Sequence, residues 1–218
     1  MAERPESSDS EDGFISREAY DRGVFGPGSN LEARFIPDYE ELERKVEACK
    51  ALDQKIVLTS GTFDIIHIGH ARYLERARQH GDVLVVGVDD DEKVRSRKGE
   101  DRPVVPQDER IAMLAHLRAV DMITLKTLSH DHLQLVKTVR PDTLIVTQEN
   151  YERYSDEELE ALNEYCGRIV VLEPQAQTTT SARIRLMHVN LGNRVTEALS
   201  KETPEFIRRV IQNLIDNA

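Results

Sequence analysis

The stretch IVLTSGTFDIIHIGHARYLERARQ, residues 56–79, decides the fold of this chain. The apolar run Ile56–Leu58 is followed by a turn that contains Gly61, and then by the apolar spacing of an amphipathic helix. Such a junction leaves unpaired backbone N–H groups at the start of the helix, where the helix dipole also favours anions. His67 and His70 stand three residues apart in the first helical turn, so both rings can donate to one phosphoryl group. The stretch therefore predicts a phosphate site, with a pair of incidental surface histidines as the alternative.

Beyond this stretch, short β-branched runs alternate with helical patterns. The runs expected to form five strands are Ile56–Thr59, Val83–Val88, Met122–Leu125, Leu144–Thr147 and Ile169–Leu172. Helices are expected near residues 69–79, 107–117, 131–139 and 156–166. The alternation is typical of a Rossmann-like α/β fold, in which a doubly wound, parallel, five-stranded sheet carries helices on both faces. Ligands of such sheets bind beyond the carboxyl ends of the strands, which is where His67 and His70 fall.

Four segments are expected along the chain: an acidic leader, an N-terminal arm with a helix, the α/β domain and a C-terminal helical extension. Their ranges are 1–13, 14–54, 55–190 and 191–218. The leader is rich in Ser, Asp and Glu without apolar periodicity and should be disordered. The arm should include a helix over Tyr39–Leu52, and Thr203-Pro204 should start the helix of the extension. The apolar stripe of that extension, from Phe206 to Ile215, must pack on its own domain or on a second subunit.

Composition excludes several classes of protein. The chain has 29 Lys plus Arg against 40 Asp plus Glu, and this net charge of -11 argues against a broad nucleic-acid-binding surface. Its two cysteines, Cys49 and Cys166, are far apart and do not have the spacing of a metal site. The sequence contains neither an apolar run of membrane-spanning length nor a signal pattern. We therefore expect a cytoplasmic protein without membrane or nucleic-acid partners.

A cluster of basic residues within the acidic chain marks a second candidate region. Lys93, Arg95, Arg97, Lys98 and Arg102 all lie between Asp89 and Pro106, in what we expect to be a long loop that closes on a polyphosphate. Lys98 is the strongest candidate, because the following Gly99 gives the backbone freedom to bring its ammonium inward. The alternative is a solvated connector whose charges balance one another.

The block Gly61–His70, GTFDIIHIGH, resembles the G-T-F-D-x-x-H-x-G-H block of the cytidylyltransferase-type nucleotidyltransferases. The resemblance covers residues 55–190 and continues through Gly81-Asp82, Arg97-Lys98-Gly99, Asp101-Arg102-Pro103, Glu109-Arg110, Arg118–Asp121 and Thr178–Ser181. It implies that a substrate phosphate attacks the α-phosphorus of a nucleoside triphosphate and that pyrophosphate leaves. His67, His70 and Lys98 would be the catalytic residues. We expect the histidines to stabilise charge on the phosphoryl group rather than to act as general bases, because a phosphate nucleophile is already ionised.

The same resemblance implies a nucleotide-binding set: Gly61, Thr62, Phe63, Asp64, Gly69, Arg110, Thr179, Thr180 and Ser181. Arg110 could instead form a surface salt bridge, and the hydroxyl run could simply cap the helix that follows it. Mg²⁺ is expected to accompany the triphosphate, and no residue is predicted to be a metal ligand. Arg118–Asp121 matches a segment that lies at a homodimer interface in the family, so a homodimer is implied.

The segment Lys98–Asp121 looks more like the heptose 1-phosphate adenylyltransferase group than the glycerol-3-phosphate cytidylyltransferase group. ATP and a sugar 1-phosphate are therefore the favoured substrates. The alternatives are CTP with glycerol 3-phosphate or a phosphorylated amino alcohol, and a noncatalytic nucleotide sensor. Gln148–Asn150, Gln175 and Gln177 depart from the family pattern near the base and the acceptor. A class I aminoacyl-tRNA synthetase shares the HIGH block but requires a K-M-S-K-S block, which is absent here.

Overall fold

The computed structural model describes residues 31–173 and 180–216, and the chain divides into two compact units, Met1–Gln175 and Ala176–Ala218. The expected acidic leader and the first part of the arm lie outside the described residues. None of the described helices is long and apolar enough to cross a membrane.

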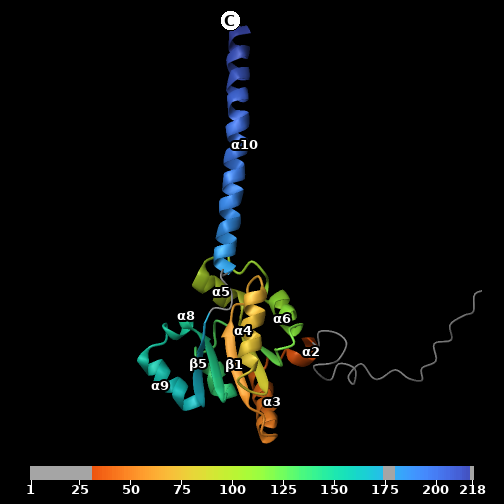
Figure 1. The fold of residues 1–218 in the computed structure, drawn as a ribbon, viewed down its shortest axis with the longest axis vertical. Helices are drawn as coiled ribbons and strands as arrows, with labels where there is room; N and C mark the ends of the chain where they lie inside the picture. The colour runs from red at the N-terminus through yellow and green to blue at the C-terminus, as the bar shows by residue number, and fades with distance from the viewer. Residues whose placement is uncertain (1–30, 174–179, 217–218) are drawn as a thin grey trace, which may run out of the picture. The chain divides into compact units, whose positions relative to one another are not determined.

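The first unit is built on one parallel sheet of five strands, as the sequence predicts (Figure 1). The strands are β1 (Ile56–Gly61), β2 (Val83–Asp89), β3 (Met122–Lys126), β4 (Thr143–Thr147) and β5 (Arg168–Leu172). Their spatial order is β3-β2-β1-β4-β5, so the order along the chain reverses between β1 and β4. This reversal is the switch point of a doubly wound sheet, beside which such folds bind ligands.

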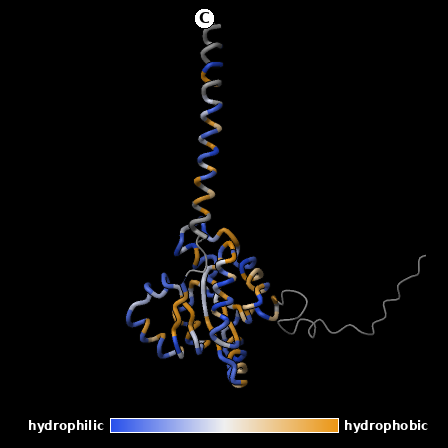
Figure 2. The backbone as a smooth tube through the Cα atoms, in the orientation of Figure 1, coloured by the Kyte–Doolittle hydropathy of each residue, from blue (hydrophilic) through white to orange (hydrophobic). Residues whose placement is uncertain are grey.

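Helices cover both faces of the sheet. On one face α3 (Tyr39–Ala51), α7 (Gln134–Val139) and α9 (Asp156–Tyr165) contribute Leu42, Val136 and Leu162 to a buried apolar cluster. On the other face α4 (Ile68–Arg78) and α6 (Gln107–Ala115) contribute Leu74 and Leu114 to a second cluster. Figure 2 shows hydrophobic residues gathered inside the first unit, and every residue of β2 is buried, as expected for a strand covered on both faces.

Aspartates at the amino-terminal edge of the sheet fix where the strands begin. The backbone N–H of Ile56 donates to Asp142 at 2.9 Å, and that of Leu84 donates to Asp121 at 2.8 Å. Asp121 also pairs with Arg78 at 2.9 Å. These contacts give Asp121 a role within one subunit, whereas the homodimer implied for its segment stays a prediction.

The end of the N-terminal arm adds to the outer edge of the sheet. After α2 (Leu31–Arg34), Phe35 forms a parallel bridge with Ile123 of β3, and the N–H of Ile36 donates to the carbonyl of Ile123 at 2.8 Å. The Arg34 side chain donates to the carbonyl of Ala115 at 2.8 Å. This segment therefore covers part of a strand edge that would otherwise be open to another chain.

Two expectations about helices are wrong. The segment Asp89–Pro106 is not simply a loop, because Asp90 caps the backbone N–H of Lys93 at 2.7 Å and starts α5 (Asp91–Lys98). No helix starts at Thr203: α10 is one helix of 37 residues, Thr180–Asp216, which passes through Pro204. The expected boundary after residue 190 falls inside α10. A short helix, α8 (Gln148–Tyr151), also follows β4 unpredicted.

Candidate functional site

The loop between β1 and α4 has an unusual backbone. Phe63 and Ile65 have φ values of 53° and 47°, a left-handed conformation that non-glycine residues rarely adopt. Phe63 is buried, and a Cβ added at Gly61 would lie 3.3 Å from its ring. The glycine thus leaves room for Phe63. Strained conformations of this kind cluster at functional sites.

The two histidines are held by backbone amides at the start of α4. The N–H of Gly69 donates to Nδ1 of His67 at 3.0 Å, and the N–H of His67 donates to Nδ1 of His70 at 3.4 Å. The rings stack with centroids 4.2 Å apart, and Phe63 contacts His70 edge-on at 5.7 Å. Because each Nδ1 accepts a hydrogen bond, the N–H donor of each neutral ring is at Nε2. The sequence prediction that these imidazoles lie together is confirmed.

His70 is neutral at physiological pH. Burial lowers the pKa of His70 to about 4, and the proximity of His67 and Lys98 adds to this, while Asp64 acts in the opposite direction. A neutral ring whose Nδ1 is occupied is suited to donating a hydrogen bond from Nε2. Donation to a phosphoryl oxygen stays a prediction for His70.

Asp64 joins two loops of the site. Its carboxylate accepts from the backbone N–H groups of Val104 and Val105 at 3.1 and 3.0 Å, and it pairs with Arg102 at 3.0 Å. Asp64 is only 3% exposed. The carboxylate therefore fixes the segment after α5 against the β1–α4 loop, and contact with a nucleotide stays a prediction for it.

Arg110, at the first turn of α6, is fully buried, so the surface salt bridge considered as its alternative role is wrong. Its guanidinium donates to the carbonyls of Thr62, Asp89 and Val105, the last two at 2.9 and 3.0 Å. It also pairs with Asp91 at 2.7 Å. Arg110 thus holds the ends of β1 and β2 together, while direct contact with a nucleotide remains a prediction.

Lys98 is the last residue of α5, and Gly99 ends the helix with a φ of 96°. The left-handed Gly99 agrees with the backbone freedom expected at this point. Lys98 is exposed by area, yet partial burial of its ammonium lowers its pKa, and the nearby Arg97 and Arg102 lower it further. Arg97 itself pairs with Asp89 at 2.9 Å.

Two buried polar atoms at this edge have no hydrogen-bond partner among the described residues: Oγ1 of Thr62 and Nε of Arg102. Buried polar groups are normally paired, and their exceptions often mark sites that a ligand or water completes. Both atoms lie on segments fastened by Asp64 and Arg110.

The structure does not describe the side chains of the predicted hydroxyl run. Thr179 lies outside the described residues, while Thr180 and Ser181 begin α10 in the second unit, with side chains that are not described. Among the described residues, no three His, Cys, Asp or Glu side chains are placed to hold a metal ion.

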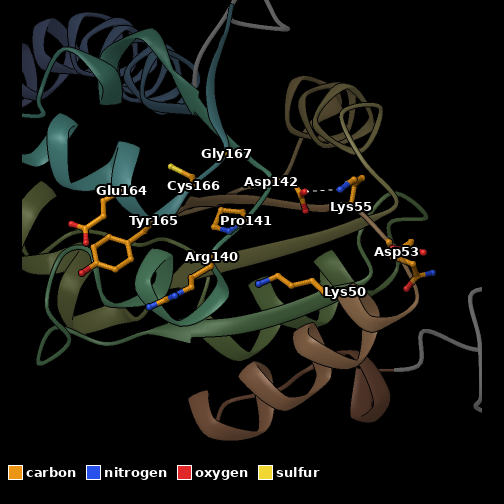
Figure 3. A pocket seen from close by; sticks show the side chains of 11 residues that line it. Lys50, Asp53, Lys55, Arg140, Pro141, Asp142, Glu164, Tyr165, Cys166 and Gly167 are labelled. Carbon is orange, nitrogen blue, oxygen red and sulfur yellow. Dashed lines mark ion pairs between the residues drawn. The ribbon is translucent and has the colours of Figure 1, made fainter.

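A cavity of about 380 Å³ lies at the opposite, amino-terminal edge of the sheet (Figure 3). Lys50, Lys55 and Arg140 line it, together with Asp142 and other residues that come before strands β1, β4 and β5. Its lysines are already engaged: Lys55 pairs with Asp142 at 3.2 Å, and Lys50 donates to the carbonyl of Val139 at 3.0 Å. None of the predicted site residues lines this cavity.

Sequence reasoning missed two charged residues at the carboxyl edge, Asp89 and Lys126. Each is the last residue of a largely apolar strand, β2 or β3, and each is buried. A charged residue at the end of a buried strand can be recognised in the sequence as a candidate site residue, because buried charges require a partner.

Comparison with known proteins gives the family. Residues 58–212 match the model of the family described as "Cytidylyltransferase-like". The "Bifunctional protein HldE" of Desulfatibacillum aliphaticivorans is 39% identical over 146 residues, which are 66% of this chain and 29% of that protein. The protein of the same name from Nitratiruptor sp. is 43% identical over 111 residues, 51% of this chain and 24% of that protein. The matched segments thus span 24–29% of the length of these relatives.

A crystal structure described as the lipopolysaccharide core biosynthesis protein from Thermoplasma volcanium is also similar. Its TM-score is 0.48 at 28% sequence identity, and the match covers 56% of this chain and 98% of that chain.

Proposed function

Because the chain belongs to the cytidylyltransferase-like family, we propose that it is a nucleotidyltransferase. It transfers a nucleoside monophosphate from a nucleoside triphosphate to a phosphorylated small molecule and releases pyrophosphate. ATP and a sugar 1-phosphate such as heptose 1-phosphate are the favoured pair. The observation that carries the proposal is the stacked pair His67 and His70, whose Nδ1 atoms both accept backbone N–H groups.

The proposed reaction is one in-line displacement. An oxygen of the acceptor phosphate forms a bond to the α-phosphorus, and the bond between that phosphorus and the β-phosphate oxygen breaks, so that pyrophosphate leaves with the electron pair. No proton has to be removed, because the acceptor phosphate is already ionised. The Nε2–H groups of His67 and His70 stabilise the charge that develops on the α-phosphoryl oxygens.

Positive charge for the leaving pyrophosphate comes from Lys98, at the end of α5. The triphosphate enters as its Mg²⁺ complex, with the ion held by phosphate oxygens and water as part of the substrate. Arg110 and Asp64 act indirectly, because their hydrogen bonds hold the loops that carry the histidines and Lys98 in place.

The choice of ATP and a sugar phosphate rests on the resemblance of Lys98–Asp121 and is supported by relatives named "Bifunctional protein HldE" at 39–44% identity. A CTP-dependent enzyme acting on glycerol 3-phosphate or a phosphorylated amino alcohol is the second candidate. The resemblance also leads us to propose a homodimer, and the composition of the chain leads us to propose a cytoplasmic protein that binds neither nucleic acid nor a membrane.

A pyrophosphate-release screen tests the proposal. ATP, CTP, GTP and UTP are each combined with heptose 1-phosphate, other sugar 1-phosphates, glycerol 3-phosphate and phosphoethanolamine. Release with ATP and a sugar 1-phosphate is the expected result, and His67→Ala serves as the inactive control. Release only with CTP would shift the assignment to the cytidylyl alternative. Nucleotide binding by calorimetry without release from any pair would favour the noncatalytic sensor and overturn the proposal.

A further inference from the structure

One face of the sheet carries a row of polar residues at the carboxyl edge, on the side covered by α3 and α7. Ser60 of β1 pairs in register with Gly87 of β2, and Asp89 of β2 pairs with Lys126 of β3. A Cβ added at Gly87 would lie 3.2 Å from Cβ of Ser60 and 3.0 Å from Cδ of Lys126. The stem of Lys126 therefore crosses β2 toward β1, which brings its ammonium to Oγ of Ser60 at 3.3 Å.

Lys126 is a buried cation without an ion pair. It is 9% exposed, and its Nζ donates to Oγ of Ser60 at 3.3 Å, but it forms no salt bridge with any carboxylate among the described residues. The nearest acidic candidate, Asp89, pairs instead with Arg97 at 2.9 Å. Burial lowers the pKa of Lys126, and Asp89 only partly opposes this effect.

The charges around Lys126 do not balance. Lys93 is also buried and donates to the carbonyl of Thr127 at 3.2 Å, so it adds positive charge without cancelling any. With Arg97, the described residues on this side of the edge include three cations, against which stand the carboxylates of Asp89 and Asp90. Taking an unpaired charge out of water is costly, so the arrangement is best explained if an anion completes it.

A second observation on the same face also points to a missing partner. Oγ1 of Thr124 is fully buried and has no hydrogen-bond partner among the described residues. Thr124 lies two residues before Lys126 on β3 and pairs in register with Gly87. A buried hydroxyl without a hydrogen-bond partner and a buried ammonium without an ion pair thus occupy successive positions of this face among the described residues.

We propose that Lys126 and Ser60 form the subsite for the phosphate of the acceptor substrate. This inference rests on the proposed function and adds which residues receive the nucleophile. Lys98 and the histidine pair would hold the triphosphate, and in-line attack requires the acceptor to approach the α-phosphorus from the side opposite the pyrophosphate. Lys126 lies on the face away from α4, and Asp89 lies near both Lys126 and Lys98, which places both lysines at one edge.

The ligand chemistry follows from the donors. An ammonium and a hydroxyl together suit a compact dianion such as a phosphate monoester, whereas a neutral acceptor group would leave the lysine charge uncompensated. The acceptor phosphate would replace the counter-ion that the fold does not supply. The rest of the acceptor is not specified by these residues.

The test compares Lys126→Met, which keeps the stem and removes the charge, with Lys126→Arg and with Lys50→Met. Lys50 is a partly buried lysine of the opposite edge that donates to Glu47 and Val139, so its replacement controls for the loss of any lysine. With the pair found in the pyrophosphate screen, Lys126→Met should raise the KM for the acceptor at least about tenfold and leave the KM for the triphosphate within about twofold. Lys126→Arg should show a smaller rise and Lys50→Met none. An unchanged acceptor KM, or an equal rise for both substrates, overturns the proposal.

Two readouts do not need turnover. Without ligand, Lys126→Met should melt at the same temperature as the parent protein or higher, because an unpaired buried charge is removed, whereas a purely structural lysine would lower the melting temperature. In calorimetric titration with inorganic phosphate, Lys126→Met should lose affinity and His67→Ala should retain more of it. If no substrate pair releases pyrophosphate, the proposed function fails, while these measurements still decide on the anion subsite. A lower melting temperature together with unchanged phosphate affinity overturns it.

Discussion

Replacing Arg110 with methionine removes the guanidinium that links the loops of the site, while most of the apolar stem of the side chain is kept. The substitution deletes the donors to the carbonyls of Thr62, Asp89 and Val105 and leaves the carboxylate of Asp91 without its cation. Removing one partner of a buried ion pair costs about 3–5 kcal/mol, and each buried acceptor left unpaired costs about 1–3 kcal/mol.

Water can replace part of what Arg110→Met removes. The side chain of Asp91 is 26% exposed, so its share of the loss falls toward the lower end, and some of the carbonyls can be rehydrated. We therefore expect the free energy of unfolding to fall by about 4 kcal/mol, a large part of the roughly 5–15 kcal/mol typical of a domain. Arg110→Lys should cost less than Arg110→Met, because it keeps a charge but loses the planar fork.

Equilibrium unfolding in urea, followed by circular dichroism, measures this loss. Arg153→Met is the matched control: its guanidinium is exposed and bonds only to Glu149 among the described residues, so its removal should change the stability by less than about 0.5 kcal/mol. A loss below about 1 kcal/mol for Arg110→Met would refute the fastening role. Unchanged stability with a large rise in the KM for the triphosphate would instead place the guanidinium on the nucleotide.

Three further predictions concern the carboxyl edge of the sheet. His67→Ala and His70→Ala should each lower kcat by about a hundredfold or more with folding retained, because a preorganised donor is lost; unchanged turnover in the pyrophosphate assay would remove that ring from the site. Lys98→Ala should raise the KM for the triphosphate as well as lower kcat, and a purely thermal effect would return Lys98 to a solvated role. The pKa of His70 is lowered from 6.5 to about 4 by folding. As pH falls, His70 is therefore protonated in the unfolded chain before it is protonated in the folded protein. His70 should therefore contribute stability that is complete above pH of about 6.5 and is lost as pH falls toward about 4, by roughly 1–3 kcal/mol given its partly exposed ring. In urea unfolding at pH 7 and 5, His70→Gln should lose less stability than the parent, and equal losses would contradict this.

The sequence predicted the sheet well because its signals are local. Each strand is a short β-branched run bounded by turns, and all five expected strands occur with ends shifted by two residues or fewer. The junction at His67 was equally predictable, since the strand, the turn and the helix start are contiguous. In these segments the local pattern of residues is sufficient to determine the strand, the turn and the start of the helix.

What the sequence did not reveal depends on contacts between distant segments. Arg110 could not be distinguished from a surface residue, because the carbonyls that accept its hydrogen bonds belong to the residue after β1, to the end of β2 and to the loop before α6. Lys126 likewise lacks an ion pair because Asp89, its nearest acidic candidate, pairs with Arg97 instead. That pairing cannot be read from the sequence. The length of α10 was missed for a different reason: Pro204 suggested a helix start, whereas the helix continues through it.

The strained backbone of the β1–α4 loop is stabilised by the hydrogen bonds of Asp64 and Arg110. Left-handed backbone at Phe63 and Ile65 costs about 1–3 kcal/mol per residue, and such a conformation persists only when surrounding contacts determine it. Asp64 and Arg110 supply those contacts from both sides, through Val104, Val105 and the carbonyl of Thr62. The backbone amides at the helix start can then fix the histidine rings before any substrate binds. Donors that are already oriented need no reorganisation when charge develops on a phosphoryl group, so in the proposed reaction these contacts would hold the two rings ready for the transition state.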